Sequence, residues 1–212
     1  MHRFKNREEA GGLLASVVKR ISTNPQVVLA VPRGGFPIAA VVARSLQLPL
    51  QAVPIRNLAL EHDLENPFGC VTSQGDTILN QALAGQQRLT PTMIHRLAQK
   101  ESANLRRDLG RWGVSVPDNL SGKSVLIVDE GMHTGWTMYS AIETMRRLGA
   151  SKIAVAVPVT QIRAQRFIQA HCDEVIVLHI EGASLYQISQ FYEDFPPVPD
   201  EQIRASAFSP VV

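Results

Sequence analysis

The hydrophobic positions in the first quarter of the chain switch between helical spacing and short continuous runs. Apolar residues three or four apart predict a helix over 8–21, and the β-branched run 27–31 predicts a strand. A loop with two glycines at 32–35 follows, and a helix over 37–46 begins with proline. The run 50–55 then predicts a second strand. One βαβ unit of this kind normally belongs to a parallel sheet.

The same alternation returns in the second half of the chain. The predicted elements are a strand over 124–128, a helix over 137–148, a strand over 152–157, a helix over 162–170 and a strand over 174–179. Strands that alternate with helices indicate an α/β fold, and we expect a doubly wound, mainly parallel sheet.

Two parts of the chain depart from this alternation. Residues 57–90 contain several glycines and prolines, with apolar segments at 70–71 and 77–79 that could pair as a hairpin. We predict a hairpin or loop insertion here and regard it as a candidate lid. Thr90 and Pro91 then begin a helix that runs to about Trp112. The last part, 181–212, predicts a small C-terminal hood or arm.

The inner face of the helix that begins at Thr90 would carry Ile94, Leu97, Leu105 and Leu109. Within the C-terminal arm, the proline-rich stretch 196–199 predicts a surface arm or lid.

Composition limits the protein class without naming a function. The 212 residues favour a single domain, 1–212, and 45% hydrophobic with 19% charged residues is typical of a globular chain. A formal net charge of +2 makes nucleic acid an unlikely partner. Cys70 and Cys172 match no metal or disulfide spacing, and no apolar stretch approaches the ~18 residues of a membrane span. We expect a soluble, cytoplasmic protein without a membrane partner.

The most informative segment joins a strand to a phosphate-type loop. The apolar run 125–128 leads into Asp129 and Glu130, and a Thr-Gly-x-Thr turn, Thr134 to Thr137, then opens a helix. Ligands of parallel sheets bind beyond the carboxyl ends of the strands, where these acids would emerge. Hydroxyl groups and unpaired backbone N–H groups at a helix start suit a phosphate dianion. The pattern indicates a sugar phosphate as ligand.

This segment resembles the signature of the type I phosphoribosyltransferases, which bind 5-phosphoribosyl 1-diphosphate (PRPP) with two consecutive acids and a Thr-Gly-x-Thr loop. The loop Pro32-Arg33-Gly34-Gly35 after the first strand, with Arg56 beyond the next, resembles a group of predicted phosphoribosyltransferases with a PRGG loop. The end of the chain, 191–195, is also similar to that group. The resemblance extends over about 3–205.

The resemblance implies a role for each matching residue. Asp129, Glu130 and Arg33 would be catalytic, with the two acids on the ribose hydroxyls. The diphosphate would meet Arg33, Gly34, Gly35 and Arg56, and the 5-phosphate would meet His133, Thr134, Gly135, Trp136 and Thr137. Mg²⁺ is the implied cofactor, held by PRPP and water with no direct protein ligand required, although Asp129 and Glu130 are candidates.

The implied activity is transfer of the phosphoribosyl group to a small nitrogenous acceptor resembling a nucleobase, with release of diphosphate. A homodimer is a further expectation. Four positions depart from the family pattern: Glu130 replaces an aspartate, His133 and Trp136 are bulkier than usual, and Asn57 stands where related sequences carry lysine. The alternative is therefore a regulatory protein that senses PRPP or a nucleotide without catalysis. It could bind nucleic acid through the basic flank 96–111.

Overall fold

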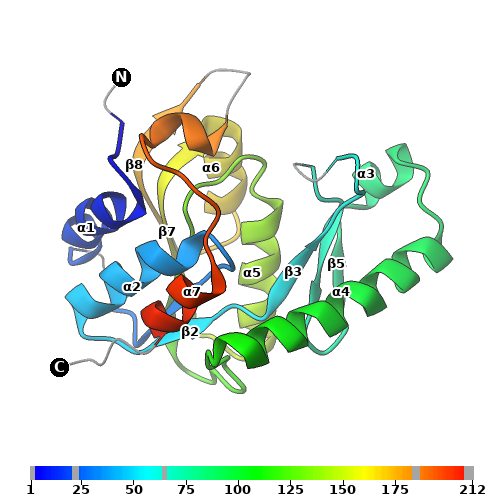
Figure 1. Cartoon of the computed structure of the whole chain (residues 1–212), viewed down its shortest axis with the longest axis horizontal. Helices are drawn as coiled ribbons and strands as arrows, with labels where there is room; N and C mark the ends of the chain where they lie inside the picture. The colour runs from blue at the N-terminus through cyan, green and yellow to red at the C-terminus, as the bar shows by residue number, and fades with distance from the viewer. Residues whose placement is uncertain (1–2, 21–23, 64–65, 183–186, 208–212) are drawn as a thin grey trace.

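A five-stranded parallel sheet forms the centre of the protein (Figure 1). The computed structural model describes residues 3–20, 24–63, 66–182 and 187–207. All four strand pairings are parallel. The spatial order is β2 (Leu50–Ala52), β1 (Val27–Ala30), β6 (Ser124–Val128), β7 (Lys152–Gln161) and β8 (Glu174–Glu181). The expected α/β fold with a parallel sheet is confirmed.

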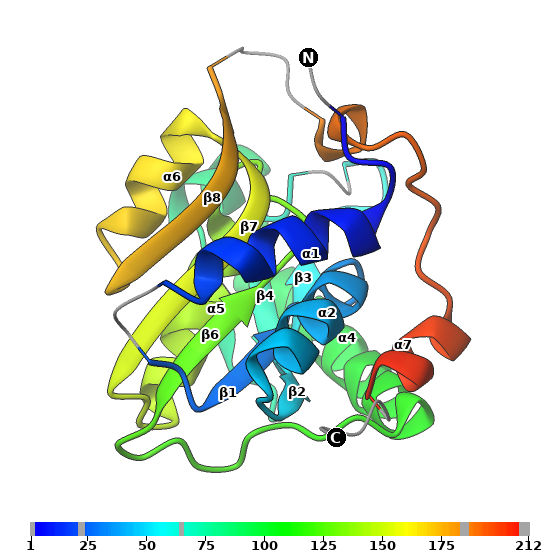
Figure 2. The ribbon, with the colours of Figure 1, turned by 90° about the vertical axis from the view of Figure 1, so that its left-hand side faces the viewer.

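Helices cover both faces of this sheet, which explains why its inner strands β1 and β6 are almost continuous apolar runs (Figure 2). In β6, Leu126 and Val128 face α1 (Arg7–Val18) and α2 (Gly35–Leu46). Alternate residues of the same strand face α5 (Trp136–Arg147) and α6 (Ile162–Gln169). The helix predicted over 37–46 is α2, which begins two residues earlier, at Gly35.

A second, antiparallel sheet carries the irregular middle of the chain. Its strands are β3 (Ile55–Leu58), β4 (Gly69–Thr72) and β5 (Thr77–Leu79). Cys70 pairs with Ile78 in the β4–β5 hairpin, as predicted for these two apolar segments. The helices α3 (Gln81–Gln86) and α4 (Pro91–Trp112) follow, and this lobe has a buried cluster of its own.

The prediction of one strand over 50–55 is wrong. Residues 50–52 pair with β1 in the central sheet, whereas Ile55 begins β3 and pairs with Thr72 in the second sheet. Pro54 lies between the two strands and has no N–H to donate to a ladder, so the chain changes sheets there. The hydrophobic run itself gives no sign of this change.

The long helix α4 connects the two parts of the molecule. It begins as predicted, because the Thr90 Oγ1 accepts a hydrogen bond from the N–H of Met93, 3.3 Å away. Of its expected inner face, Leu105 and Leu109 are buried, and Ile94 and Leu97 are partly buried.

The C-terminal arm contains structure that the sequence analysis did not predict. A short 3₁₀ helix, η1 (Ile188–Phe191), and the helix α7 (Asp200–Ala207) flank an extended segment. Val198 and Ile203 are buried in the same cluster as α2. We call residues 191–203 the strap. Within the described residues, no helix is both long and apolar enough to cross a membrane.

Two neighbouring glycines of α1 test how closely it packs on α2. A Cβ at Gly11 would lie 3.0 Å from the Cβ of Val41, whereas a Cβ at Gly12 would meet nothing within 4 Å. We expect Gly12→Ala to raise the free energy of unfolding by about 0.5–1 kcal/mol, because alanine restricts the unfolded chain. Gly11→Ala should lower it through overpacking. Urea denaturation measures both, and equal stabilisation by both substitutions would contradict the close packing.

Candidate functional site

The two sequence motifs lie side by side at the carboxyl edge of the central sheet. β1 pairs in parallel with β6 over the whole length of β1, with Ala30 opposite Val128. The chain continues from β1 toward β2 on one side and from β6 toward β7 on the other, so the loops diverge at a topological switch point. In open parallel sheets this is where ligands bind.

A cavity of about 220 Å³ lies between these loops. Eight of the residues predicted from the sequence line it: Arg33, Gly34, Asp129, Glu130, His133, Thr134, Gly135 and Thr137. Asn57 and Pro67 from the second sheet and its loop also contribute, as does Ile188 of η1. We call this space the motif cavity.

Three predicted residues do not line the motif cavity. Gly35 lies beneath it, where a Cβ would be 2.7 Å from the carbonyl oxygen of Val128. Trp136 packs against the rings of Tyr139 and Phe167. Arg56 lines an adjacent cavity of about 210 Å³, which shares Arg33 and other lining residues with the motif cavity.

The first acid is held by its neighbour's backbone. The Oδ1 of Asp129 accepts a hydrogen bond of 2.7 Å from the N–H of Glu130. Burial raises the pKa of Asp129 well above its usual range, and the adjacent Glu130 carboxyl raises it further. Burial also raises the pKa of Glu130, against the opposing effect of Arg7.

The second acid is clamped by a residue that sequence reasoning missed. The Nε of Arg7 donates to the Oε2 of Glu130 over 2.6 Å, and its Nη1 donates to the carbonyl oxygen of Pro196 over 2.8 Å. The guanidinium lies 3.8 Å from the centre of the Phe195 ring, and only 9% of the Arg7 side chain is exposed. Nothing near Arg7 in the sequence distinguishes it from a solvent-exposed arginine.

The Glu130 carboxylate also leaves no space for a side chain at position 34. A Cβ at Gly34 would lie 2.0 Å from the Glu130 carboxyl carbon, so this carboxylate lies directly on the backbone of Gly34. The Tyr192 hydroxyl donates to the carbonyl oxygen of Glu130 over 2.8 Å. Glu130 is thus turned toward the first loop, and helix α1 and the strap hold it there.

Arg33 is tied to the strap as well. The peptide bond between Pro32 and Arg33 is cis. The Arg33 Nε donates to the carbonyl oxygen of Val198 over 3.2 Å, and its Nη2 pairs with Asp200. Asp200 also accepts from the indole N–H of Trp112 over 2.9 Å.

An alternating chain of charges joins the two arginines of the predicted diphosphate site. Arg111 Nε lies 2.8 Å from Asp200 Oδ2, and its Nη2 lies 2.8 Å from Asp108 Oδ1. Arg56 Nη2 in turn lies 2.5 Å from Asp108 Oδ2. Arg111 therefore makes ion pairs within the protein. Arg106, a second arginine of the predicted basic flank, donates to the carbonyl oxygen of Ser73 and to the Ser102 Oγ.

The phosphate-type loop has the geometry that the sequence pattern predicts. Gly135 has a φ of +84°, which glycine adopts without strain, and α5 begins at the next residue. The Thr134 Oγ1 accepts from the N–H of Trp136 over 3.4 Å. The Thr137 hydroxyl donates to the Oδ1 of Asn57 over 3.0 Å, so Asn57 bridges the loop and the second sheet. The start of α5 can therefore receive an anion.

The donor set is compatible with a magnesium ion that a ligand brings with it. Among the described residues, no cluster of three histidine, cysteine or carboxylate side chains could hold a metal alone. Asp129 and Glu130 offer hard oxygen atoms at the motif cavity, and Mg²⁺ commonly takes few protein ligands beside phosphate oxygens and water.

Comparisons with a family model and with curated proteins point to the same family. The model of the phosphoribosyl transferase domain family matches residues 5–190. A Mycobacterium tuberculosis protein named "Putative phosphoribosyl transferase Rv0571c" is 31% identical over 208 residues, which are 97% of this chain and 46% of the relative. A counterpart from a second strain matches equally. The chain thus spans about half the length of these curated relatives.

Solved structures support the same fold. The crystal structure of TT1426 from Thermus thermophilus aligns with a TM-score of 0.79 and 29% identity, covering 97% of each chain. An APRTase from Giardia lamblia, complexed with 9-deazaadenine, aligns with a TM-score of 0.52 and 16% identity. That alignment covers 84% of this chain and 80% of the other, and it bears on the fold alone.

The raised pKa of Asp129 predicts a pH-dependent stability. The folded protein retains a proton that the unfolded chain releases near pH 4, so this residue makes the free energy of unfolding fall as pH rises through the folded-state pKa. Asp129→Asn removes the titration and keeps the Oδ1 acceptor. We expect the variant to be more stable than the wild type at neutral pH, with the difference shrinking toward pH 4. Urea denaturation across pH measures this, and a constant difference would contradict it.

The contacts of Asp200 predict that it anchors the strap. Asp200→Asn should speed amide hydrogen exchange over residues 198–203, because the ion pairs with Arg33 and Arg111 weaken. Glu201→Gln is the matched control, since Glu201 pairs with Arg204 in its own helix. Hydrogen exchange by mass spectrometry compares the two variants. Equal exchange in the strap of both would show that Asp200 has no special role.

Proposed function

The chain belongs to the phosphoribosyl transferase family, and on that basis we propose that it transfers the 5-phosphoribosyl group of PRPP to a nitrogenous, nucleobase-like acceptor. The reaction releases diphosphate and uses Mg²⁺. The observation that carries this proposal is the meeting of the two motifs in one cavity: Arg33 and Gly34 face Asp129 and the loop that ends at Thr137.

Each part of the cavity suits one part of PRPP. The start of α5, with the Thr134 and Thr137 hydroxyls, provides hydrogen-bond donors and a favourable dipole for the 5-phosphate. Asp129 is the acid available to the ribose hydroxyls, because Glu130 is already paired with Arg7. Arg33 and the glycine-containing loop would receive the diphosphate. The 5-phosphate and the diphosphate of PRPP would thus bind at two separate loops.

The chemistry requires positioning more than a protein nucleophile. The bond between ribose C1 and the diphosphate oxygen breaks through an oxocarbenium-like transition state, and its electron pair leaves with the diphosphate. The acceptor nitrogen forms the new bond to C1 and loses its proton to solvent. Mg²⁺, when bound with PRPP, offsets the charge of the leaving group. Arg33 adds a cation at the same place.

Exclusion of water is a second requirement, since hydrolysis of PRPP competes with transfer. We propose that the insertion 57–90 acts as the lid. Asn57 and Pro67 of this segment already line the motif cavity. We also propose a single domain over 1–212, a cytoplasmic location and a homodimer.

The structure also gives a reason to keep the second candidate, a PRPP or nucleotide sensor without catalysis. Arg33 is paired with Asp200, Glu130 is paired with Arg7, and Asn57, which stands where related sequences carry lysine, bridges to Thr137. Each of these contacts occupies a group that turnover would use. Binding without turnover would be the consequence.

Calorimetry with PRPP and Mg²⁺, followed by an assay of diphosphate release with a panel of nucleobases, tests both candidates. We expect PRPP to bind and at least one base to give turnover. Thr134→Ala should weaken PRPP binding about tenfold or more, since it removes a hydrogen bond to a charged group. Thr92→Ala, an exposed position on α4 outside the motif cavity, is the matched control.

The outcomes separate the candidates. Binding of PRPP without turnover on any base favours the sensor, and a salt-dependent titration with RNA and DNA then tests its nucleic-acid form. Absence of PRPP binding would overturn both candidates.

A further inference from the structure

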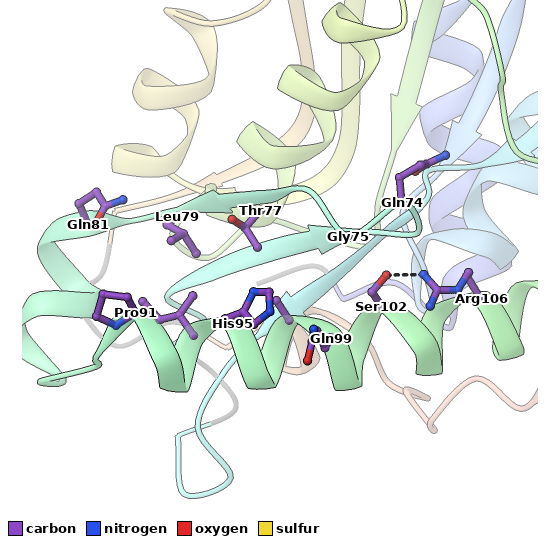
Figure 3. Close-up of a pocket in the computed structure, with 12 residues that line it drawn as sticks. Gln74, Gly75, Thr77, Leu79, Gln81, Pro91, His95, Gln99, Ser102 and Arg106 are labelled. Atoms are coloured by element: carbon purple, nitrogen blue, oxygen red, sulfur yellow. Dashed lines mark hydrogen bonds between the residues drawn. The ribbon is translucent and has the colours of Figure 1, made fainter.

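A cavity larger than the motif cavity lies away from it. It has a volume of about 560 Å³, against about 220 Å³ for the motif cavity, and the two share no lining residue. It lies between the β4–β5 hairpin and α4 (Figure 3). We call it the hairpin groove. Its volume is within the range of small-molecule sites.

One stripe of α4 forms a wall of the hairpin groove. Pro91, His95, Ala98, Ser102 and Arg106 recur every three or four residues, with Gln99 beside Ala98 and four residues after His95, so they share one face of the helix. Ala98 and Ser102 are buried at 5% and 2% exposure and form its base. Thr77 and Leu79 of β5 point toward this stripe from the opposite wall (Figure 3). The groove is therefore bounded by two ordered elements.

The groove has a cation at one end and, among its described lining residues, no carboxylate. Arg106 Nη1 donates to the carbonyl oxygen of Ser73 over 2.6 Å and to the Ser102 Oγ over 2.8 Å. Within the described chain Arg106 has no acidic partner, unlike Arg56 and Arg111. A guanidinium that is already oriented and retains unused donors suits an anion.

The rest of the groove offers neutral hydrogen-bonding groups beside apolar ones. The side chains of Thr77, Gln81, His95 and Gln99 make no hydrogen bond to any residue in the described ranges. A glutamine amide presents a donor and an acceptor together, which matches the edge of a heterocycle. Leu79 and Ile94 provide apolar surface for the face of a ring. Gln99 and Arg106 are separated by about 10 Å along α4, at 1.5 Å per residue.

We propose that the hairpin groove is a second ligand site, which binds a small organic anion with a planar, hydrogen-bonding ring, the chemistry of a nucleoside monophosphate. The phosphate meets Arg106, and the ring lies between β5 and α4 near Gln99. The proposal concerns residues outside the motif cavity and does not depend on turnover there.

The hairpin groove and the region around the motif cavity share helix α4. The helix that carries Gln99 and Arg106 also carries Asp108, which pairs with Arg56, and Leu105, which lines the cavity beside Arg33. Ser102 bonds to the carbonyl oxygens of Thr72 and Ser73 at the end of β4. A ligand that holds the hairpin against α4 would thus act on elements shared with the proposed PRPP site.

Amide NMR spectra of the full chain, titrated with AMP and with UMP, test the proposal site by site. Gly75, Thr77 and Gln99 report on the hairpin groove, whereas Gly131 and Thr134 report on the motif cavity. We expect a monophosphate to shift the groove signals in a saturable way. Adenosine and inorganic phosphate, titrated separately, should each bind at least tenfold more weakly.

Two substitutions with matched controls assign the binding to named side chains. Gln99→Glu places a carboxylate in the groove, and Gln86→Glu makes the same change at an exposed position of α3 outside it. Arg106→Gln removes the cation, and Arg107→Gln removes a neighbour whose Nη2 bonds to Asn104. We expect Kd to rise about tenfold or more for Gln99→Glu and Arg106→Gln, because each affects a charged contact. The controls should stay within about twofold of the wild type.

Several results would overturn the proposal. Unshifted groove signals at millimolar AMP and UMP would do so, even if Thr134 responds and the PRPP proposal stands. Equal weakening of monophosphate binding by Gln99→Glu and Gln86→Glu would show that the effect comes from the net charge of the protein and not from a carboxylate in the groove. Binding of inorganic phosphate as tightly as AMP would show that the groove does not recognise the ring. Thermal melting of each variant verifies that it folds.

Discussion

The close approach of two loops at the carboxyl edge of the sheet governs the rest of this structure. The pairing of β1 with β6 brings Gly34 and Gly35 against Asp129 and Glu130. A Cβ at Gly34 would lie 2.0 Å from the Glu130 carboxyl carbon, and one at Gly35 would lie 2.7 Å from a carbonyl oxygen. A larger residue at Gly35 would therefore collide with the backbone of the second loop, whereas one at Gly34 would displace the Glu130 carboxylate. The absence of a side chain at both glycines is what lets the two loops meet beside the motif cavity.

Bringing acids and arginines to one partly buried edge creates an electrostatic requirement. An ionised group loses hydration on burial, and a partner of opposite charge must offset that loss. The α1 helix supplies Arg7 for Glu130, and the strap supplies Asp200 for Arg33. Helix α1 and the strap, which lie outside the central sheet, thus hold the charges of the proposed site in place. The same contacts decide which groups a ligand can reach.

Two cavities of different chemical character lie on one framework. The motif cavity is formed by loops at a switch point and combines one arginine, Arg33, with two acids, which suits a ligand with both phosphates and hydroxyls. The hairpin groove is formed by a helix face and a hairpin and is lined without carboxylates in the described structure. The helix α4 contributes to both regions, through Arg106 at one and Leu105 beside the other. One helix therefore connects the two regions physically.

The sequence alone was sufficient to predict the parallel sheet, the β4–β5 hairpin, the start of α4 and the two motif loops. These features follow from periodicity, capping residues and glycines that act over a few neighbouring positions. It was not sufficient to predict α7, the division of residues 50–55 between two sheets, or the partners of Glu130 and Arg33. Arg7 and Glu130 are 123 positions apart, and Arg33 and Asp200 are 167 apart. Only the folded chain brings such residues together, because packing of the helices and the strap on the sheet determines which charges meet.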